Sequence, residues 1–260
     1  MTDESNLTWK ELVERAIQQL GGKAHLKQIN DVIAGHPKTD TNPTWRDTIR
    51  RVVRQYSVFE PVPPSRSGVY RLVALPDVHA QPEEMTGDEK IDHSIAQGML
   101  LSLGRMYGYD TFAPANDQTA RKFLGRPLAT LASIRDCSNF CDKSLARVRQ
   151  IDAMWLGADN EGAYPVYAFE VEHTTGVKSG LDRLVEIPDR YEAQLFVVAP
   201  GDEEQGLFEK LTQHNRFRKF RNRMQFRRYA DLSRLYNAAV QHDKIRNSFG
   251  VRPWPELDQD

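Results

Sequence analysis

The sequence has 260 residues, with 35 Lys and Arg against 36 Asp and Glu, which gives a formal net charge of −1. This length suits one or two domains, and a hydrophobic share of 40% is enough to form a core, which excludes a disordered chain. No apolar run is long enough to span a membrane, and the first residues lack the apolar core of a secretory signal, so we expect a cytoplasmic protein and no membrane partner.

The positive charge gathers in two segments. Residues 42–75 carry six arginines and two acids, and residues 214–228 carry seven cations and no acid. Binding to phosphates requires a local basic face rather than a basic total, although an ordinary solvated helix face remains the alternative for the second segment. The arginines that we predict to contact DNA are Arg46, Arg50, Arg51, Arg54, Arg66, Arg221 and Arg223.

The N-terminal part has the pattern of three helices followed by a β-hairpin. The first helix is expected over 8–20, where Thr8 and Glu11 have the spacing of a capping box. Two more helices follow at 25–34 and 42–56, and the hairpin strands at 58–62 and 69–73. This order resembles a winged-helix DNA-binding domain, whose third helix enters the major groove. The domain would cover residues 1–78, and the alternative is a winged helix that binds protein.

A segment without periodicity, residues 79–88, is predicted to be a linker to a second domain over residues 89–260. We predict an α/β sandwich, α+β or α/β in class, around a central mixed sheet. Its helices are expected at 89–106, 175–185, 203–214 and 229–240, a turn at 116–117, and strands at 109–114, 151–156, 164–173 and 194–200.

Three carboxylates are expected to converge at one end of this sheet. Asp152 begins one strand, and Glu170 and Glu172 lie two residues apart on the next, hence on one face. Neighbouring carboxylates repel one another, and a bound divalent cation removes that repulsion. Ligands that are all oxygens suit Mg²⁺, so we predict Asp152 and Glu170 as metal ligands and all three acids as catalytic.

Asp152 followed by Glu170-Val171-Glu172 resembles the motif of the PD-(D/E)xK nuclease superfamily, which includes most type II restriction endonucleases. The resemblance implies that Asp152 and Glu170 hold the metal and that the residue two positions on orients or activates a water. That position is usually Lys and here is Glu172, as in some restriction enzymes. Lys178 and His173 are accessory candidates. The alternative is a strand edge whose carboxylates are simply solvated.

The helix that opens the second domain carries four polar residues that could face the metal, and the sequence does not choose among Glu89, Asp92, His93 and Gln97. The favoured alternative is that they belong to an ordinary helix surface.

The sequence thus predicts a site-specific endonuclease of restriction type that hydrolyses double-stranded DNA with Mg²⁺. Since cutting both strands needs two sites, a homodimer is expected. A separate reader domain leaves a requirement for a methylated base open. The alternative is a non-enzymatic winged-helix DNA-binding regulator with an α/β dimerisation or sensor domain. A repair or transposon-associated nuclease that acts on DNA structure is a third, weaker interpretation.

Overall fold

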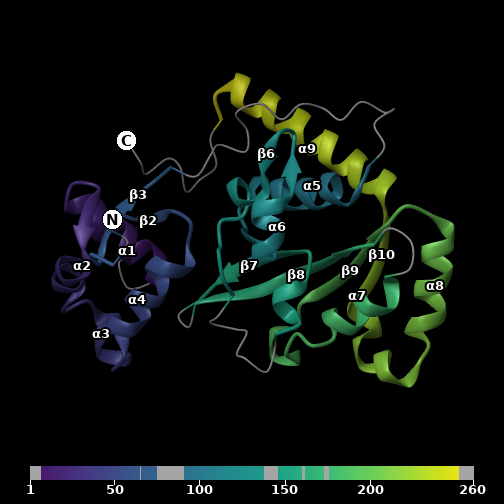
Figure 1. The fold of residues 1–260 in the computed structure, drawn as a ribbon, viewed down its shortest axis with the longest axis horizontal. Coiled ribbons are helices and arrows are strands. Elements are labelled where there is room, and N and C mark those ends of the chain that lie inside the picture. Colours follow the sequence, from purple (N-terminus) through teal and green to yellow (C-terminus); the bar gives the residue numbers. More distant parts are fainter. Residues whose placement is uncertain are drawn as a thin grey trace.

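The computed structural model describes residues 7–64, 66–74, 91–137, 146–159, 162–172 and 176–251. It is a mixed α+β protein with an N-terminal helical unit beside a larger unit built on a five-stranded mixed sheet (Figure 1). None of the helices in these ranges is long and apolar enough to cross a membrane.

The N-terminal unit confirms the predicted helices and hairpin and adds a strand and a short helix. The added strand completes a three-stranded sheet of order β1-β3-β2, with both pairings antiparallel. The elements are α1 (Trp9–Gln19), β1 (Lys23–His25), α2 (Leu26–Ile33), α3 (Pro37–Thr41), α4 (Trp45–Gln55), β2 (Phe59–Pro61) and β3 (Val69–Leu72).

Capping and amphipathic patterning explain these helices. The Thr8 hydroxyl accepts the Glu11 amide at 3.2 Å, and the Glu11 carboxylate accepts the Thr8 amide at 2.6 Å, which is the predicted capping box. Each long helix buries its apolar stripe, and in α4 this stripe includes Ile49 and Val53, both fully buried. The opposite side of α4 therefore presents arginines to solvent.

The second unit is a sheet of order β10-β9-β8-β7-β4 between two layers of helices. The α5 and α9 helices cover one face, and α7 and α8 cover the other (Figure 1). Its elements are α5 (His93–Met106), β4 (Asp110–Phe112), α6 (Ala115–Ala120), β5 (Lys122–Phe123), β6 (Arg126–Pro127), β7 (Ala153–Ala158), β8 (Ala163–Val171), α7 (Val177–Leu184), β9 (Gln194–Ala199), α8 (Asp202–Thr212), β10 (Met224–Arg228) and α9 (Tyr229–Phe249).

Two local expectations need correction. The expected turn at 116–117 lies inside α6, and α9 continues to Phe249 instead of ending near residue 240.

The basic segment 214–228, for which no element was predicted, forms a 3₁₀ helix (Asn215–Arg223) and then β10, which pairs with β9 in parallel. The strand was hard to predict because arginines occupy many of its positions. Phe226 packs against Phe208 of α8, whereas Arg227 and Arg228 are exposed.

The two units are joined by a hydrogen-bonded junction. Tyr56 pairs with Ile134 as an isolated β-bridge, and the Ser57 amide donates to the Ser133 carbonyl at 2.8 Å. The Arg135 guanidinium donates to the carbonyls of Ser57 and Phe59, each at 3.0 Å. These bonds hold the N-terminal unit against the sheet unit. The predicted linker at 79–88 lies outside the described residues.

Candidate active site

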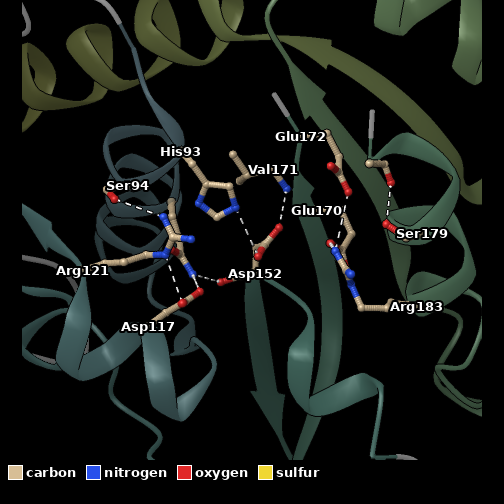
Figure 2. Close-up of polar contacts among 12 residues, drawn as sticks. His93, Ser94, Asp117, Arg121, Asp152, Glu170, Val171, Glu172, Ser179 and Arg183 are labelled. Carbon is tan, nitrogen blue, oxygen red and sulfur yellow. Dashed lines mark hydrogen bonds and ion pairs between the residues drawn. The ribbon is translucent and has the colours of Figure 1, made fainter. Parts of the chain in front are cut away.

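Asp152 immediately precedes β7 and is buried at the end of the sheet (Figure 2). Its Oδ2 accepts the Val171 amide of β8 at 2.8 Å, and its Oδ1 lies 3.4 Å from His93 Nε2 of α5. Antiparallel pairing of β7 with β8 sets Ala153 opposite Phe169, so Asp152 falls beside the end of β8. The expected proximity of Asp152 to the two glutamates is therefore present.

Glu170 is fully buried on the face of β8 that α7 covers. Both of its carboxylate oxygens accept hydrogen bonds from Arg183 of α7, one from Nε at 2.8 Å and one from Nη2. This forked pair places a guanidinium beside the carboxylates (Figure 2). Burial is the main cause that raises the pKa of Glu170 well above its ordinary value, and the Arg183 hydrogen bonds oppose that shift.

Glu172 follows β8 and lies against the start of α7, where two glycines make room for it. A Cβ at Gly176 would stand 1.7 Å from Glu172 Oε2, and one at Gly180 would stand 2.7 Å from Oε1. The nearest guanidinium atom is Arg183 Nη2, 3.6 Å from Oε1, and this buried oxygen accepts no hydrogen bond within the described part of the chain. Burial, and then the charge of Asp152, raise the pKa of Glu172.

Helix α5 contributes two residues to the site. Both are among the four polar residues of this helix that the sequence analysis considered as neighbours of the metal. His93 faces Asp152, and Gln97, fully buried, donates to the Asp152 carbonyl at 2.6 Å and to Asp117 Oδ2 at 3.0 Å. Asp92 instead caps α5 by accepting the Ile95 amide at 2.8 Å. Glu89 lies outside the described residues.

Of the two accessory candidates, neither is placed in the site. Lys178 is exposed on α7, and no contact with the carboxylates is seen among the described residues, while His173 lies outside those residues. The cation beside the acids is Arg183, which the sequence analysis missed. The sequence did contain a signal for it. Gly176, Gly180 and Arg183 have helical spacing, which places them on one face of α7.

A divalent cation fits the charge of this site. Three carboxylates against one guanidinium leave −2 when all are ionised, and Glu172 Oε1 is an acceptor without a hydrogen-bond donor among the described residues. Within those same residues, however, no three His, Cys, Asp or Glu side chains are already arranged to hold a metal ion. Glu170 is turned to Arg183, which uses one lone pair on each oxygen and leaves others available.

The arginines of α4 and the hairpin line two hollows at the junction with the sheet unit, which contributes Arg135 to one and Asp136 to the other. Arg54 lines both: a hollow of about 520 Å³ with Arg66 and Arg135, and another of about 420 Å³ with Arg50 and Arg51. Arg46 is exposed and lies over the Trp45 ring at 4.2 Å. The five arginines predicted here thus lie on α4 and the β2–β3 hairpin.

The basic segment 214–228 is different, because much of its charge is neutralised within the protein. Arg216 pairs with Asp182 at 3.1 Å, and Lys219 and Arg223 both pair with Asp189. Arg228 pairs with Asp202. Arg221 donates to the Thr212 carbonyl at the end of α8. Although the segment itself contains no acid, four of its seven cations therefore form ion pairs with acids elsewhere in the chain.

Comparison with known proteins supports a restriction-enzyme relationship. Residues 74–252 match the family model described as the C-terminal domain of the type II restriction enzyme NmeDI. The curated NmeDI enzyme of Neisseria meningitidis serogroup C is 26% identical over 231 residues, which cover 84% of this chain and 62% of that protein. The chain thus matches less than two thirds of that relative's length. No solved structure shows a significant match.

Proposed function

The chain belongs to the family of the C-terminal domain of the type II restriction enzyme NmeDI, and on that premise we propose that it is a site-specific endonuclease of double-stranded DNA. The observation that carries the proposal is the cluster of Asp152, Glu170 and Glu172 beside Arg183 at one end of a mixed sheet. We assign this cluster to a PD-(D/E)xK site, with the glutamate Glu172 in the position usually held by lysine.

Asp152 and Glu170 would hold Mg²⁺ through carboxylate oxygens. When bound, the cation supplies positive charge for the phosphate and lowers the pKa of a water. His93 and the Val171 amide orient the Asp152 carboxylate, and Arg183 orients that of Glu170. Glu172 Oε1 accepts the proton of the attacking water, because it is buried, lacks a hydrogen-bond donor among the described residues and has a raised pKa.

The N-terminal unit would be a winged helix that holds the duplex. Support comes from the order α1-β1-α2-α3-α4-β2-β3 and from the exposed Arg46, Arg54 and Arg66 around α4 and the hairpin. A helix that presents arginines can enter a major groove and read guanine through a forked pair of hydrogen bonds. Arg221 and Arg223 would act indirectly, since their guanidinium groups are bound to carbonyls and to Asp189.

The test is digestion of plasmids, grown with and without adenine or cytosine methylation, in the presence of Mg²⁺. Discrete fragments with one repeated end sequence are expected, and the methylation state that is cut decides whether a modified base is required. Duplex binding without any nicking in Mg²⁺ or Mn²⁺ would show a non-enzymatic regulator instead.

The Asp152→Asn variant should lose cleavage by on the order of 100-fold or more, because even outer partners of metal ligands contribute 10–100-fold. Gel-shift affinity for the same duplex in EDTA should stay unchanged. Glu203→Gln, which removes an exposed acid on α8, is the matched control and should cut like the parent. Full cleavage by Asp152→Asn would remove Asp152 from the site.

A further inference from the structure

The exposed apolar side chains of the described residues gather around α9. Seven large hydrophobic residues are exposed in the described part of the chain, and four of them lie on α9 or directly after it: Leu235, Ile245, Phe249 and Val251. Two more, Tyr107 and Leu124, flank this helix, since Tyr107 ends α5 and Phe123 contacts Tyr236 of α9. The helix lies along the outer edge of the molecule (Figure 1). Such a concentration marks an interaction surface.

The exposed side of α9 carries its own helical stripe. Its members recur with spacings of three and four residues, and all are exposed: Leu235, Ala238, His242, Ile245 and Phe249. A second stripe, which includes Tyr236 and Val240, packs on the sheet unit. The helix thus has a buried apolar stripe and an exposed one that is apolar except for His242, and the exposed stripe has the spacing of a coiled-coil seam.

A hollow of about 490 Å³ opens beside the N-terminal half of this stripe. Its α9 wall is formed by Asp231, Leu232 and Leu235. Its sheet wall contains the rings of Trp155, Tyr167 and Phe196, with Arg227 at the adjoining end of β10. The Trp155 and Tyr167 centroids are 5.4 Å apart, and those of Tyr167 and Phe196 are 6.2 Å apart. An aromatic or aliphatic side chain suits this lining.

We propose that a second copy of the chain covers this face, with the two α9 helices antiparallel and Phe249 of each protomer seated at the aromatic hollow of the other. Phe249 is the most exposed of the large hydrophobic residues, at 82%. It lies 14 residues from Leu235, which is about 21 Å along a helix. One face therefore carries both the projecting ring and the hollow, as the self-complementary patch of a two-fold dimer must.

A nucleic acid is a poorer occupant, because the stripe itself bears no lysine or arginine for phosphates. The choice of a second copy also rests on the proposed function, since cutting both strands requires two catalytic centres.

Sedimentation velocity of the full chain at micromolar concentration, without DNA or metal, tests the dimer. The parent should sediment as a dimer, and Phe249→Ser as a monomer that still unfolds in one cooperative transition. Val32→Ser, which alters an exposed apolar residue of α2, is the control and should stay dimeric. Ile245→Asp, at a position 64% exposed, is a second disrupting variant.

A monomeric parent, or a Phe249→Ser variant that stays dimeric, would overturn the proposal. The assay needs no catalysis, so its failure is separate from that of the nuclease assignment. A dimer that never cuts DNA would contradict the nuclease assignment alone.

Discussion

In the N-terminal unit, Arg46, Arg54 and Arg66 stand exposed around α4 and the hairpin, whereas in the sheet unit Arg183 and Arg223 are largely buried and meet carboxylates. Arginine therefore has a different role in each unit. Exposed cations on one side of a unit contribute to binding of phosphates and are screened by salt. Buried cations neutralise acids that would otherwise destabilise the fold, so their loss should appear in stability.

The largest effect on stability is expected at the buried ion pair of Arg183 and Glu170. Arg183→Met should lower the free energy of unfolding by about 3–5 kcal/mol, because the Glu170 carboxyl is then buried in the core without its cationic, hydrogen-bonded partner. Urea unfolding in EDTA measures this loss. The double variant with Glu170→Leu should recover most of the stability, since it removes the unpartnered buried carboxyl. Absence of recovery would show that Arg183 acts by packing alone.

The next effect concerns DNA binding by the N-terminal unit. Arg54→Ala should weaken duplex binding by about 1–3 kcal/mol and reduce the salt dependence, while leaving urea unfolding unchanged. Arg54 is the residue to choose because it lines both arginine-bordered hollows. Fluorescence anisotropy at several salt concentrations gives affinity and slope. Arg15→Ala, which removes an exposed charge from α1, is the control; an equal loss there would indicate non-specific attraction.

A smaller effect is expected in the basic segment 214–228. Arg223→Ala should cost about 1–2 kcal/mol of stability, because its guanidinium links Asp189 to the Ala193 carbonyl before β9. Arg218→Ala, at an exposed neighbour in the same segment, should change stability by less than about 0.5 kcal/mol. Equal free energies of unfolding for the two variants would contradict the expected difference between Arg223 and Arg218.

The smallest change is a pH dependence. The pKa of Glu172 is raised in the folded protein, so the contribution of this carboxyl to the stability of the metal-free chain should be greatest below the ordinary value of about 4.5 and be lost as pH rises through the folded pKa. Glu172→Gln should flatten this trend and be the more stable protein at neutral pH. Thermal melts in EDTA over a pH series measure it, and parallel profiles for parent and variant would contradict it.

Local patterning was sufficient for most elements. The capping box at Thr8, the apolar stripe of α4 and the apolar run that became β9 all depend on neighbours in the sequence, and each was predicted. The β1 strand was not, because Lys23–His25 is held only by its pairing with β3. Likewise β10 exists because it pairs with β9, and its arginines conceal the alternation.

The sequence by itself determined that Asp152, Glu170 and Glu172 would meet, because strand order and the two-residue period of a strand bring them to one end of the sheet. Tertiary structure decided what faces them. Arg183 and His93 come from helices on opposite faces, and no short-range pattern encodes the distance between them. It also decided which cations of the basic segment pair with acids, since Asp182, Asp189 and Asp202 lie at least 26 residues from their cationic partners and are brought there by packing alone.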